Sequence, residues 1–190
     1  MAESSVKREI VTEYLVKFVP LVILVEKNQF KQRKLNMKIL GIGNAIVDVI
    51  CKVDDDFLSK NNLTKSTMKL IFDDKEFKNL LSSLKIEKTV SGGSVANSIV
   101  GLSQLGNKVG FIGKVSEDEL GNKYEEGLKQ ENVQYFYSKK KEELPTGTCL
   151  ILVTPDSERT MCTFLGTAGK INQNDVSTDA IKQSEIILLE

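Results

Sequence analysis

The chain has 190 residues, and its apolar and charged fractions of 41% and 27% are those of an ordinary globular protein. The 26 basic and 26 acidic residues balance to a net charge of zero, which argues against long-range attraction to nucleic acid or to an acidic membrane. The chain has no histidine and three widely spaced cysteines, so a Cys/His zinc site is disfavoured, histidine-assisted nucleophilic catalysis is excluded, and free thiols in a reducing, cytoplasmic compartment are expected.

The first 36 residues differ from the rest and are expected to form an extension outside the main domain. They hold seven Lys or Arg against four Glu. Their apolar run, 14–25, contains Lys17 and Pro20 and is shorter than the roughly 20 residues that a membrane-spanning helix needs. A self-contained pattern begins at Met37, so we expect the main domain to occupy residues 37–190.

From Met37 onward, strand-like and helix-like patterns follow one another. In chain order we expect strands at 38–43, 45–53 and 67–72, helices at 73–84 and 94–105, a strand at 108–113, a helix at 118–130, strands at 133–137, 148–154 and 160–164, a helix at 174–183 and a strand at 185–189. This alternation predicts an α/β fold with a largely parallel sheet flanked by helices. The strands at about 46–53, 67–72 and 148–164 do not alternate with helices, which predicts a small additional sheet.

The segment 91–97 is the first candidate ligand site. Gly92 and Gly93 allow a tight turn and close approach to the backbone, and the helix that follows offers free N–H groups at its start. Asn97 lies one turn into that helix and carries both a donor and an acceptor, which suits sugar hydroxyls. A plain junction between loop and helix explains the glycines equally well.

Asp48 is the second candidate, because it interrupts an otherwise apolar stretch. A carboxylate in such surroundings needs a partner. Two adjacent ribose hydroxyls would provide one; the alternative is an aspartate that caps a strand or a turn.

Neither familiar nucleotide motif occurs in the chain. There is no G-x-x-x-x-G-K-[ST] segment, and the run from Gly41 to Gly43 lacks the third glycine of the dinucleotide fingerprint, since Ile46 stands there. Any nucleotide site in this chain therefore uses neither of these two motifs.

Several blocks, taken in order, resemble the ribokinase or PfkB carbohydrate kinase family. They are Gly41-Ile42-Gly43-Asn44 with Asp48, Gly92-Gly93-Ser94 with Asn97, and Phe111-Ile112-Gly113-Lys114-Val115 with Asp118 and Leu120-Gly121. The segment Pro145-Thr146-Gly147-Thr148-Cys149, with Asp156, Arg159 and Thr160, is most similar to the adenosine kinase branch. The resemblance begins at Met37 and leaves residues 1–36 without a counterpart.

The resemblance implies a parallel sheet flanked by helices with a small β-sheet lid, and transfer of phosphoryl from ATP, with Mg²⁺, to a sugar or nucleoside hydroxyl. It implies that Asp48 binds the ribose 2′- and 3′-hydroxyls and that Gly93 and Asn97 hold the same sugar. The lid residues over the ligand would be Met68, Cys149, Met161 and Leu165. Arg159 would reach toward phosphate, or would simply be an exposed arginine near a turn.

The family's catalytic aspartate belongs to a Gly-Ala-Gly-Asp motif, which this sequence does not contain. We therefore name no catalytic residue or metal ligand. We expect a truncated gene product, a fragment or one piece of a split enzyme, with the edge of the sheet at the last strand exposed. The alternative to a kinase is a non-catalytic remnant or regulatory fragment that binds a sugar or nucleoside. The expected partner is a small molecule, with no nucleic acid and no membrane, and the chain is expected to be monomeric, as adenosine kinases usually are.

Overall fold

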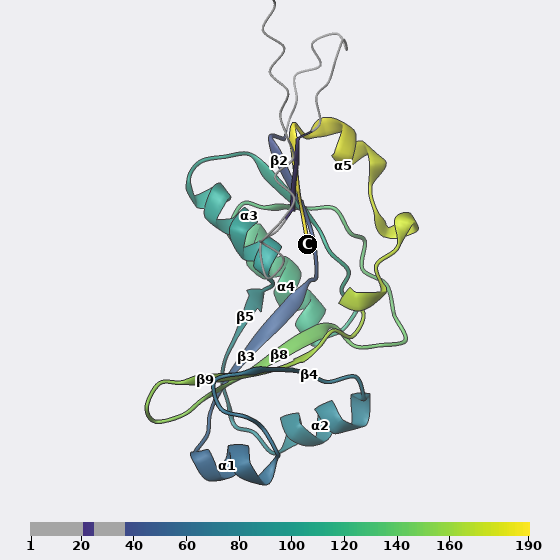
Figure 1. Cartoon of the computed structure of the whole chain (residues 1–190). Helices are drawn as coiled ribbons and strands as arrows, with labels where there is room; N and C mark the ends of the chain where they lie inside the picture. Colours follow the sequence, from purple (N-terminus) through teal and green to yellow (C-terminus); the bar gives the residue numbers. More distant parts are fainter. Residues whose placement is uncertain (1–20, 25–36) are drawn as a thin grey trace, which may run out of the picture.

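The computed structural model describes residues 21–24 and 37–190, which form two five-stranded β-sheets with helices packed against them (Figure 1). The first sheet has the strand order β1-β10-β2-β6-β7. Its strands are β1 (Leu21–Leu24), β2 (Ile39–Ile42), β6 (Val109–Ile112), β7 (Gln134–Tyr135) and β10 (Ile186–Leu189). β10, β2, β6 and β7 are parallel to one another, and β1 is antiparallel to β10. The predicted parallel sheet is thus confirmed.

Helices cover both faces of this first sheet. α3 (Ser94–Gln104) packs on β2 and β6, and α4 (Glu119–Gln130) packs beside it on β7. Gly41 allows the close approach of α3, since a Cβ at this residue would lie 2.5 Å from the Ile99 side chain. On the other face, Ala180 of α5 (Thr178–Gln183) packs with the buried side chains of Leu40 and Ile112.

The second sheet has the strand order β4-β9-β8-β3-β5 and is the small sheet that the sequence predicts (Figure 1). Its strands are β3 (Ile46–Lys52), β4 (Met68–Leu70), β5 (Ile86–Gly92), β8 (Gly147–Val153) and β9 (Arg159–Phe164). One face is buried by α1 (Asp55–Lys60) and α2 (Asp74–Ser82), whose Leu58 and Phe77 join its apolar core. The opposite face carries Asp48 of β3, with Met68 of β4 and Met161 of β9.

Most of the expected elements are present, and the differences have local causes. The structure adds α1, begun by the Asp54 cap, and β5, neither of which was predicted. The expected helix at 174–183 is divided into a 3₁₀ turn, η2 (Gln173–Asp175), and the helix α5. The division arises because the Ser177 hydroxyl caps the start of α5. A further 3₁₀ turn, η1 (Ala168–Lys170), follows β9.

The expected exposed edge at the last strand is wrong. β1, which belongs to the extension, pairs with β10 over four residues and covers that edge. Most of the extension, residues 1–20 and 25–36, lies outside the described residues, and the domain boundary at residue 37 stays a prediction.

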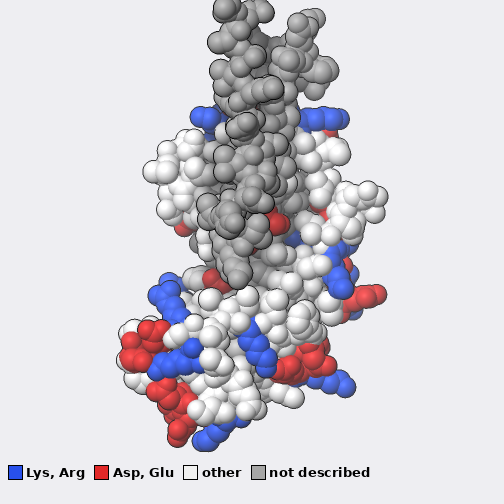
Figure 2. All heavy atoms as spheres, in the orientation of Figure 1, with Lys and Arg blue, Asp and Glu red and all other residues white. Residues whose placement is uncertain are grey.

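The surface in view shows the mixture of charges that the balanced composition predicts, and the cysteines are free thiols, as expected. Figure 2 shows basic and acidic side chains interspersed over the face in view, and Lys65, for example, pairs with both Asp55 and Asp156. All three cysteines are free and buried. Across residues 21–24 and 37–190, no helix is both long and apolar enough to cross a membrane.

Candidate substrate site

The open face of the second sheet carries Asp48 at its centre. Asp48 on β3 is opposite Val90 on β5 and Cys149 on β8, and Cys149 is in turn opposite Thr163 on β9. Residues that are directly opposite in neighbouring strands project from the same face of a sheet. Strand register therefore gathers these side chains, which are far apart in the sequence, into one row.

The next row on the same face is apolar. Ile50 is opposite Ile151, Ile151 is opposite Met161, and Met161 is opposite Met68. Met68 and Met161 are 45% and 39% exposed. The structure thus places an open apolar surface next to Asp48.

Leu165 completes this surface where β9 ends. It packs with the small cluster formed by Ile46, Cys149 and Ala168. The four predicted lid residues, Met68, Cys149, Met161 and Leu165, therefore lie on or beside the face that carries Asp48. Their contact with a ligand stays a prediction.

The Asp48 carboxyl group is half-buried and makes no hydrogen bond or ion pair with any residue that the structure describes. Burial raises its pKa to about 6, because loss of water disfavours the charged form. Both oxygens are therefore available to a hydroxyl donor. Asp48 is not the strand cap that was the alternative, since it occupies the middle of β3.

Gly92, at the end of β5, lets the Asp48 carboxyl lie where it does. A Cβ on Gly92 would be 2.3 Å from Oδ2 of Asp48, closer than such atoms ever come. The next residue, Gly93, has a φ of +99° and is the N-cap of α3. A Cβ there would lie 2.4 Å from the Asn44 carbonyl oxygen, so backbone geometry alone requires this glycine.

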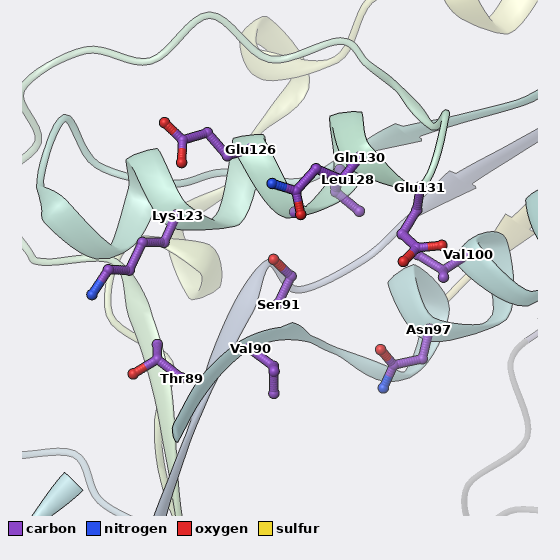
Figure 3. Close-up of a pocket in the computed structure, with 11 residues that line it drawn as sticks. Thr89, Val90, Ser91, Asn97, Val100, Lys123, Glu126, Leu128, Gln130 and Glu131 are labelled. Atoms are coloured by element: carbon purple, nitrogen blue, oxygen red, sulfur yellow. The ribbon is translucent and has the colours of Figure 1, made fainter. Parts of the chain in front are cut away.

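Asn97 belongs to a different surface, a groove of about 470 Å³ between β5, α3 and α4 (Figure 3). Thr89, Val90 and Ser91 line one wall, and Lys123, Glu126 and Glu131 of α4 or its end line the other. Val90 links the two surfaces, since it is opposite Asp48 and also lines the groove. The structure therefore brings Asn97 near the strand that borders Asp48, but does not place Asp48 in the groove.

Arg159 lies away from the Asp48 row, at the other end of β9. It is exposed, begins β9 and is opposite Val153 at the hairpin end of the sheet. It precedes Thr163 by four positions of β9, a distance of about 13 Å along a strand. Its side chain has no hydrogen bond or ion pair among the described residues, and its role toward phosphate stays a prediction.

Tyr124 of α4 contacts the backbone at Gly92, a role that the sequence does not predict. Its side chain is fully buried, and its hydroxyl donates to the Gly92 carbonyl at 3.3 Å. The Ser91 hydroxyl donates to the Tyr124 carbonyl at 3.2 Å. Burial, with the nearby Tyr135 and Asp48, raises the Tyr124 pKa well above its ordinary value, so the hydroxyl stays protonated. The sequence predicts the helix but not which strand the tyrosine reaches.

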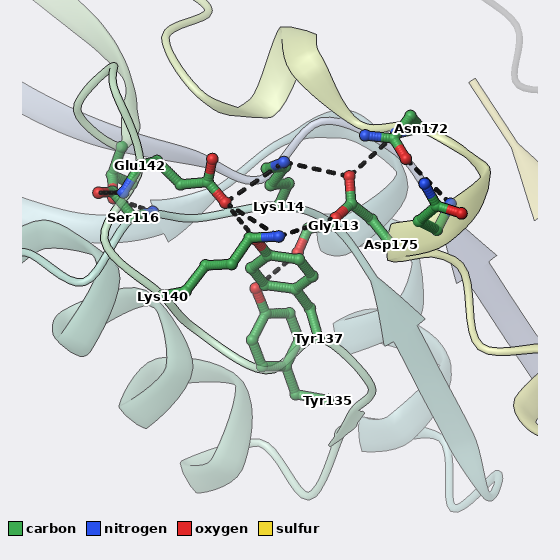
Figure 4. A network of polar contacts seen from close by, with 11 residues as sticks. Gly113, Lys114, Ser116, Tyr135, Tyr137, Lys140, Glu142, Asn172 and Asp175 are labelled. Atoms are coloured by element: carbon green, nitrogen blue, oxygen red, sulfur yellow. Dashed lines mark hydrogen bonds and ion pairs between the residues drawn. The ribbon is translucent and has the colours of Figure 1, made fainter.

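A buried polar network lies beyond the carboxyl end of β6 (Figure 4). The Lys114 ammonium group is 3.1 Å from Asp175 and 3.3 Å from Glu142. Tyr137 donates to Glu142 at 2.8 Å, and Lys140 lies 3.7 Å from both acids. Burial would lower the Lys114 pKa, but hydrogen bonds to the two acids outweigh it and the pKa is raised. The network joins the end of β6 to η2 and to the segment that leads into β8.

The described residues offer no metal site of a usual kind: nowhere in this part of the chain do three or more Cys, Asp or Glu side chains gather closely enough to hold an ion.

Comparison with known proteins gives consistent matches. Residues 42–190 match the family described as pfkB family carbohydrate kinase. A 5-dehydro-2-deoxygluconokinase of Mesomycoplasma hyopneumoniae is 28% identical over 120 residues, which are 62% of this chain and 36% of that protein. Adenosine kinase 2 of Arabidopsis thaliana is 29% identical over 159 residues, which are 77% of this chain and 42% of that protein.

Among solved structures, an adenosine kinase from Sinorhizobium meliloti superposes with a TM-score of 0.71 and 36% identity. The match covers 78% of this chain and 45% of that one. The chain thus spans less than half the length of these relatives, and its fold is that of the adenosine kinases.

Proposed function

Because this chain belongs to the pfkB family of carbohydrate kinases, we propose that it supplies the substrate-binding half of an enzyme that phosphorylates a hydroxyl group of a sugar or nucleoside with ATP. The substrate half is the face of the second sheet around Asp48, with Gly93 and Asn97 as further sugar contacts. Arg159 is the candidate for contact with phosphate.

The observation that supports this proposal most directly is the Asp48 carboxyl group. It is half-buried, its pKa is raised to about 6, and the described residues give it no partner. A carboxylate can accept hydrogen bonds from two adjacent hydroxyls at once, which replaces the water that burial removes. Adjacent hydroxyls are the feature that sugars and ribonucleosides share.

The surroundings of Asp48 favour a nucleoside over a free sugar. A sugar is polar on nearly all sides, whereas a nucleoside joins a polar ribose to a flat base with an apolar face. Met68 and Met161 present an open apolar surface one row away from Asp48. Flexible thioethers pack well against aromatic rings. We therefore propose an adenosine-like nucleoside, with its 5′-hydroxyl as the phosphoryl acceptor, in a cytoplasmic monomer.

A second candidate function is a binding module without catalysis. It is favoured by the absence of a Gly-Ala-Gly-Asp motif from residues 1–190. ATP and Mg²⁺ are the co-substrate and cofactor that the family implies, and none of the described residues is proposed as a Mg²⁺ ligand.

Calorimetry on the purified 190-residue chain tests the proposal. Adenosine is expected to bind, 2′-deoxyadenosine to bind about 10- to 100-fold more weakly through loss of one hydrogen bond to a charged group, and 5-dehydro-2-deoxygluconate to bind more weakly than adenosine. Failure of the folded chain to bind adenosine contradicts the nucleoside assignment. Tighter binding of the sugar acid than of adenosine would instead indicate the substrate site of a sugar kinase. An ATP-dependent phosphorylation assay is expected to give no product; turnover by this chain alone would show that it is more than the binding half.

A further inference from the structure

Gly92 and Gly93 form an adaptable stretch of backbone beside Asp48. Glycine tolerates conformations that other residues avoid, and Gly93 uses one of them, with a φ of +99°. Asp48 leans on this stretch, since its carboxyl group fills the space that a side chain at Gly92 would occupy. The position of the carboxyl group therefore depends on what fixes the glycine pair.

Hydrogen bonds from two helices fix the glycine pair. The backbone N–H of Asn97 donates to the Gly93 carbonyl at 2.8 Å, which is a bond within the first turn of α3. The Tyr124 hydroxyl comes from α4 and donates to the Gly92 carbonyl at 3.3 Å. The Ser91 hydroxyl donates in return to the Tyr124 carbonyl at 3.2 Å. Tyr124 is thus joined to the end of β5 by both its side chain and its backbone.

The Tyr124 side chain is itself held in one place. It is fully buried, and the ring centroids of Phe111 and Tyr135 each lie 6.2 Å from its own, a spacing at which aromatic rings attract one another. α4 is fixed at its start, where the Asp118 carboxylate accepts a hydrogen bond from the backbone of Gly121 at 2.7 Å. The hydroxyl is therefore a fixed reference point for a backbone that has little stiffness of its own.

Tyr124 and the Asp48 carboxyl group are close enough to interact. Burial raises the pKa of Tyr124, and the nearby Tyr135 and the negative charge of Asp48 raise it further. We propose that Tyr124 is a positioning residue for the substrate: its hydroxyl fixes the Gly92 carbonyl, and the fixed glycine sets where Asp48 meets the substrate hydroxyls. This inference rests on the proposed function, in which Asp48 binds adjacent hydroxyls of a nucleoside.

Adenosine binding to the full chain tests the effect on the substrate. Tyr124→Phe keeps the ring and removes only the hydroxyl, and we expect it to weaken adenosine binding about 5- to 10-fold, the usual cost of one hydrogen bond. Tyr135→Phe is the matched control and is expected to bind normally, because its hydroxyl donates at 2.6 Å to Gly113, a glycine that follows β6 in the first sheet. In an Asp48→Asn chain, Tyr124→Phe is expected to cause no further loss, since the tyrosine acts through Asp48.

Titration of Asp48 in the ligand-free chain, followed by carbon NMR of its carboxyl group, tests the positioning without a substrate. Tyr124 and Cys149 both feel the charge of Asp48, but burial raises the pKa of each, so both are neutral near pH 6. The titration therefore reports how well water reaches the carboxyl group. Without the tyrosine hydroxyl the glycine pair loosens and admits water, so we expect the pKa of Asp48 to fall from about 6 toward 3.8 in Tyr124→Phe and to stay unchanged in Tyr135→Phe.

The two measurements separate this proposal from the proposed function. If the wild type does not bind adenosine, the proposed function is wrong, while the titration still decides whether Tyr124 positions Asp48. An unchanged Asp48 titration in Tyr124→Phe overturns the proposal, and so does an equal loss of affinity in the Asp48→Asn chain. A Tyr124→Phe chain that unfolds where Tyr135→Phe stays folded also overturns it, because the hydroxyl would then serve the fold rather than the site.

Discussion

The carboxyl group of Asp48 lies against the bare backbone of Gly92, where a Cβ would be 2.3 Å from Oδ2. The two residues belong to neighbouring strands, β3 and β5, and their contact explains a glycine that the chain conformation does not require, since Gly92 has no positive φ. The glycine makes room for the carboxyl group, and Tyr124 holds the glycine carbonyl from the other side. This contact underlies the first four predictions.

Replacement of Asp48 by Asn is expected to weaken adenosine binding about 10- to 100-fold, because a neutral amide replaces a charged acceptor of hydrogen bonds. The same change is expected to leave the free energy of unfolding equal or higher at neutral pH, since the carboxylate is half-buried without a partner. Calorimetry and urea unfolding measure the two effects. Asp56→Asn, in the exposed first turn of α1, is the control. Unchanged affinity in the Asp48 variant would remove this residue from the site.

Asp48 is expected to make the folded chain less stable as the pH rises, whereas most aspartates have the opposite effect. The pKa of Asp48 is raised from 3.8 to about 6 in the folded chain, so between these values the folded state binds more protons than the unfolded state. Its contribution to stability is therefore full below about pH 4 and is lost as the pH rises through 6. Unfolding of wild type and Asp48→Asn between pH 4 and 7 measures it, and the variant is expected to gain relative stability with rising pH. A pH-independent difference contradicts the raised pKa.

Adenosine affinity is expected to change in the opposite direction over the same range. The ionised carboxylate is the better acceptor, so binding strengthens as the pH rises through about 6 and then levels off. Titration calorimetry from pH 5 to 8 checks this, with Asp48→Asn expected to show no such rise. A rise that persists in the variant would assign it to another group.

Replacement of Gly92 by Ala is expected to displace the Asp48 carboxyl group and to weaken adenosine binding. Overpacking of this kind costs roughly 1–3 kcal/mol of stability. Gly101→Ala is the matched control, because no atom lies within 4 Å of its Cβ position in α3 and alanine favours a helix. The control is expected to be more stable and to bind normally. Normal binding by Gly92→Ala would mean that the carboxyl position is unimportant.

Replacement of Lys114 by Met is expected to lower the free energy of unfolding by roughly 3 kcal/mol, because it leaves Asp175 and Glu142 buried with only the more distant Lys140 nearby. Urea unfolding followed by circular dichroism measures the change. Lys123→Met loses only an exposed pair with Glu119 one helical turn away and is expected to have little effect. Equal stability of the two variants would show that the network does not stabilise the fold.

The local features of this protein could be predicted from its sequence, since they depend on residues close together in the chain. Asp73 and Asp118 mark helix starts, and each accepts a hydrogen bond from the backbone three residues later. Apolar runs marked most strands, and the ordered blocks from Gly41 to Thr160 identified the family. The predicted strand at 67–72 and its membership of a small sheet with the 148–164 strands were also correct in outline.

The tertiary structure alone decided which of these local elements meet. Asp48 shares a row with Cys149 and Thr163, about a hundred residues away, because of strand register, and a shift of one residue would turn Asp48 to the opposite face. The same holds for β1 against β10, for Tyr124 beneath Gly92 and for the acids around Lys114. Such contacts depend on the whole packed fold and leave no periodic signal in the chain. The sequence by itself determined the family and the candidate residues, and packing decided which of them form one surface.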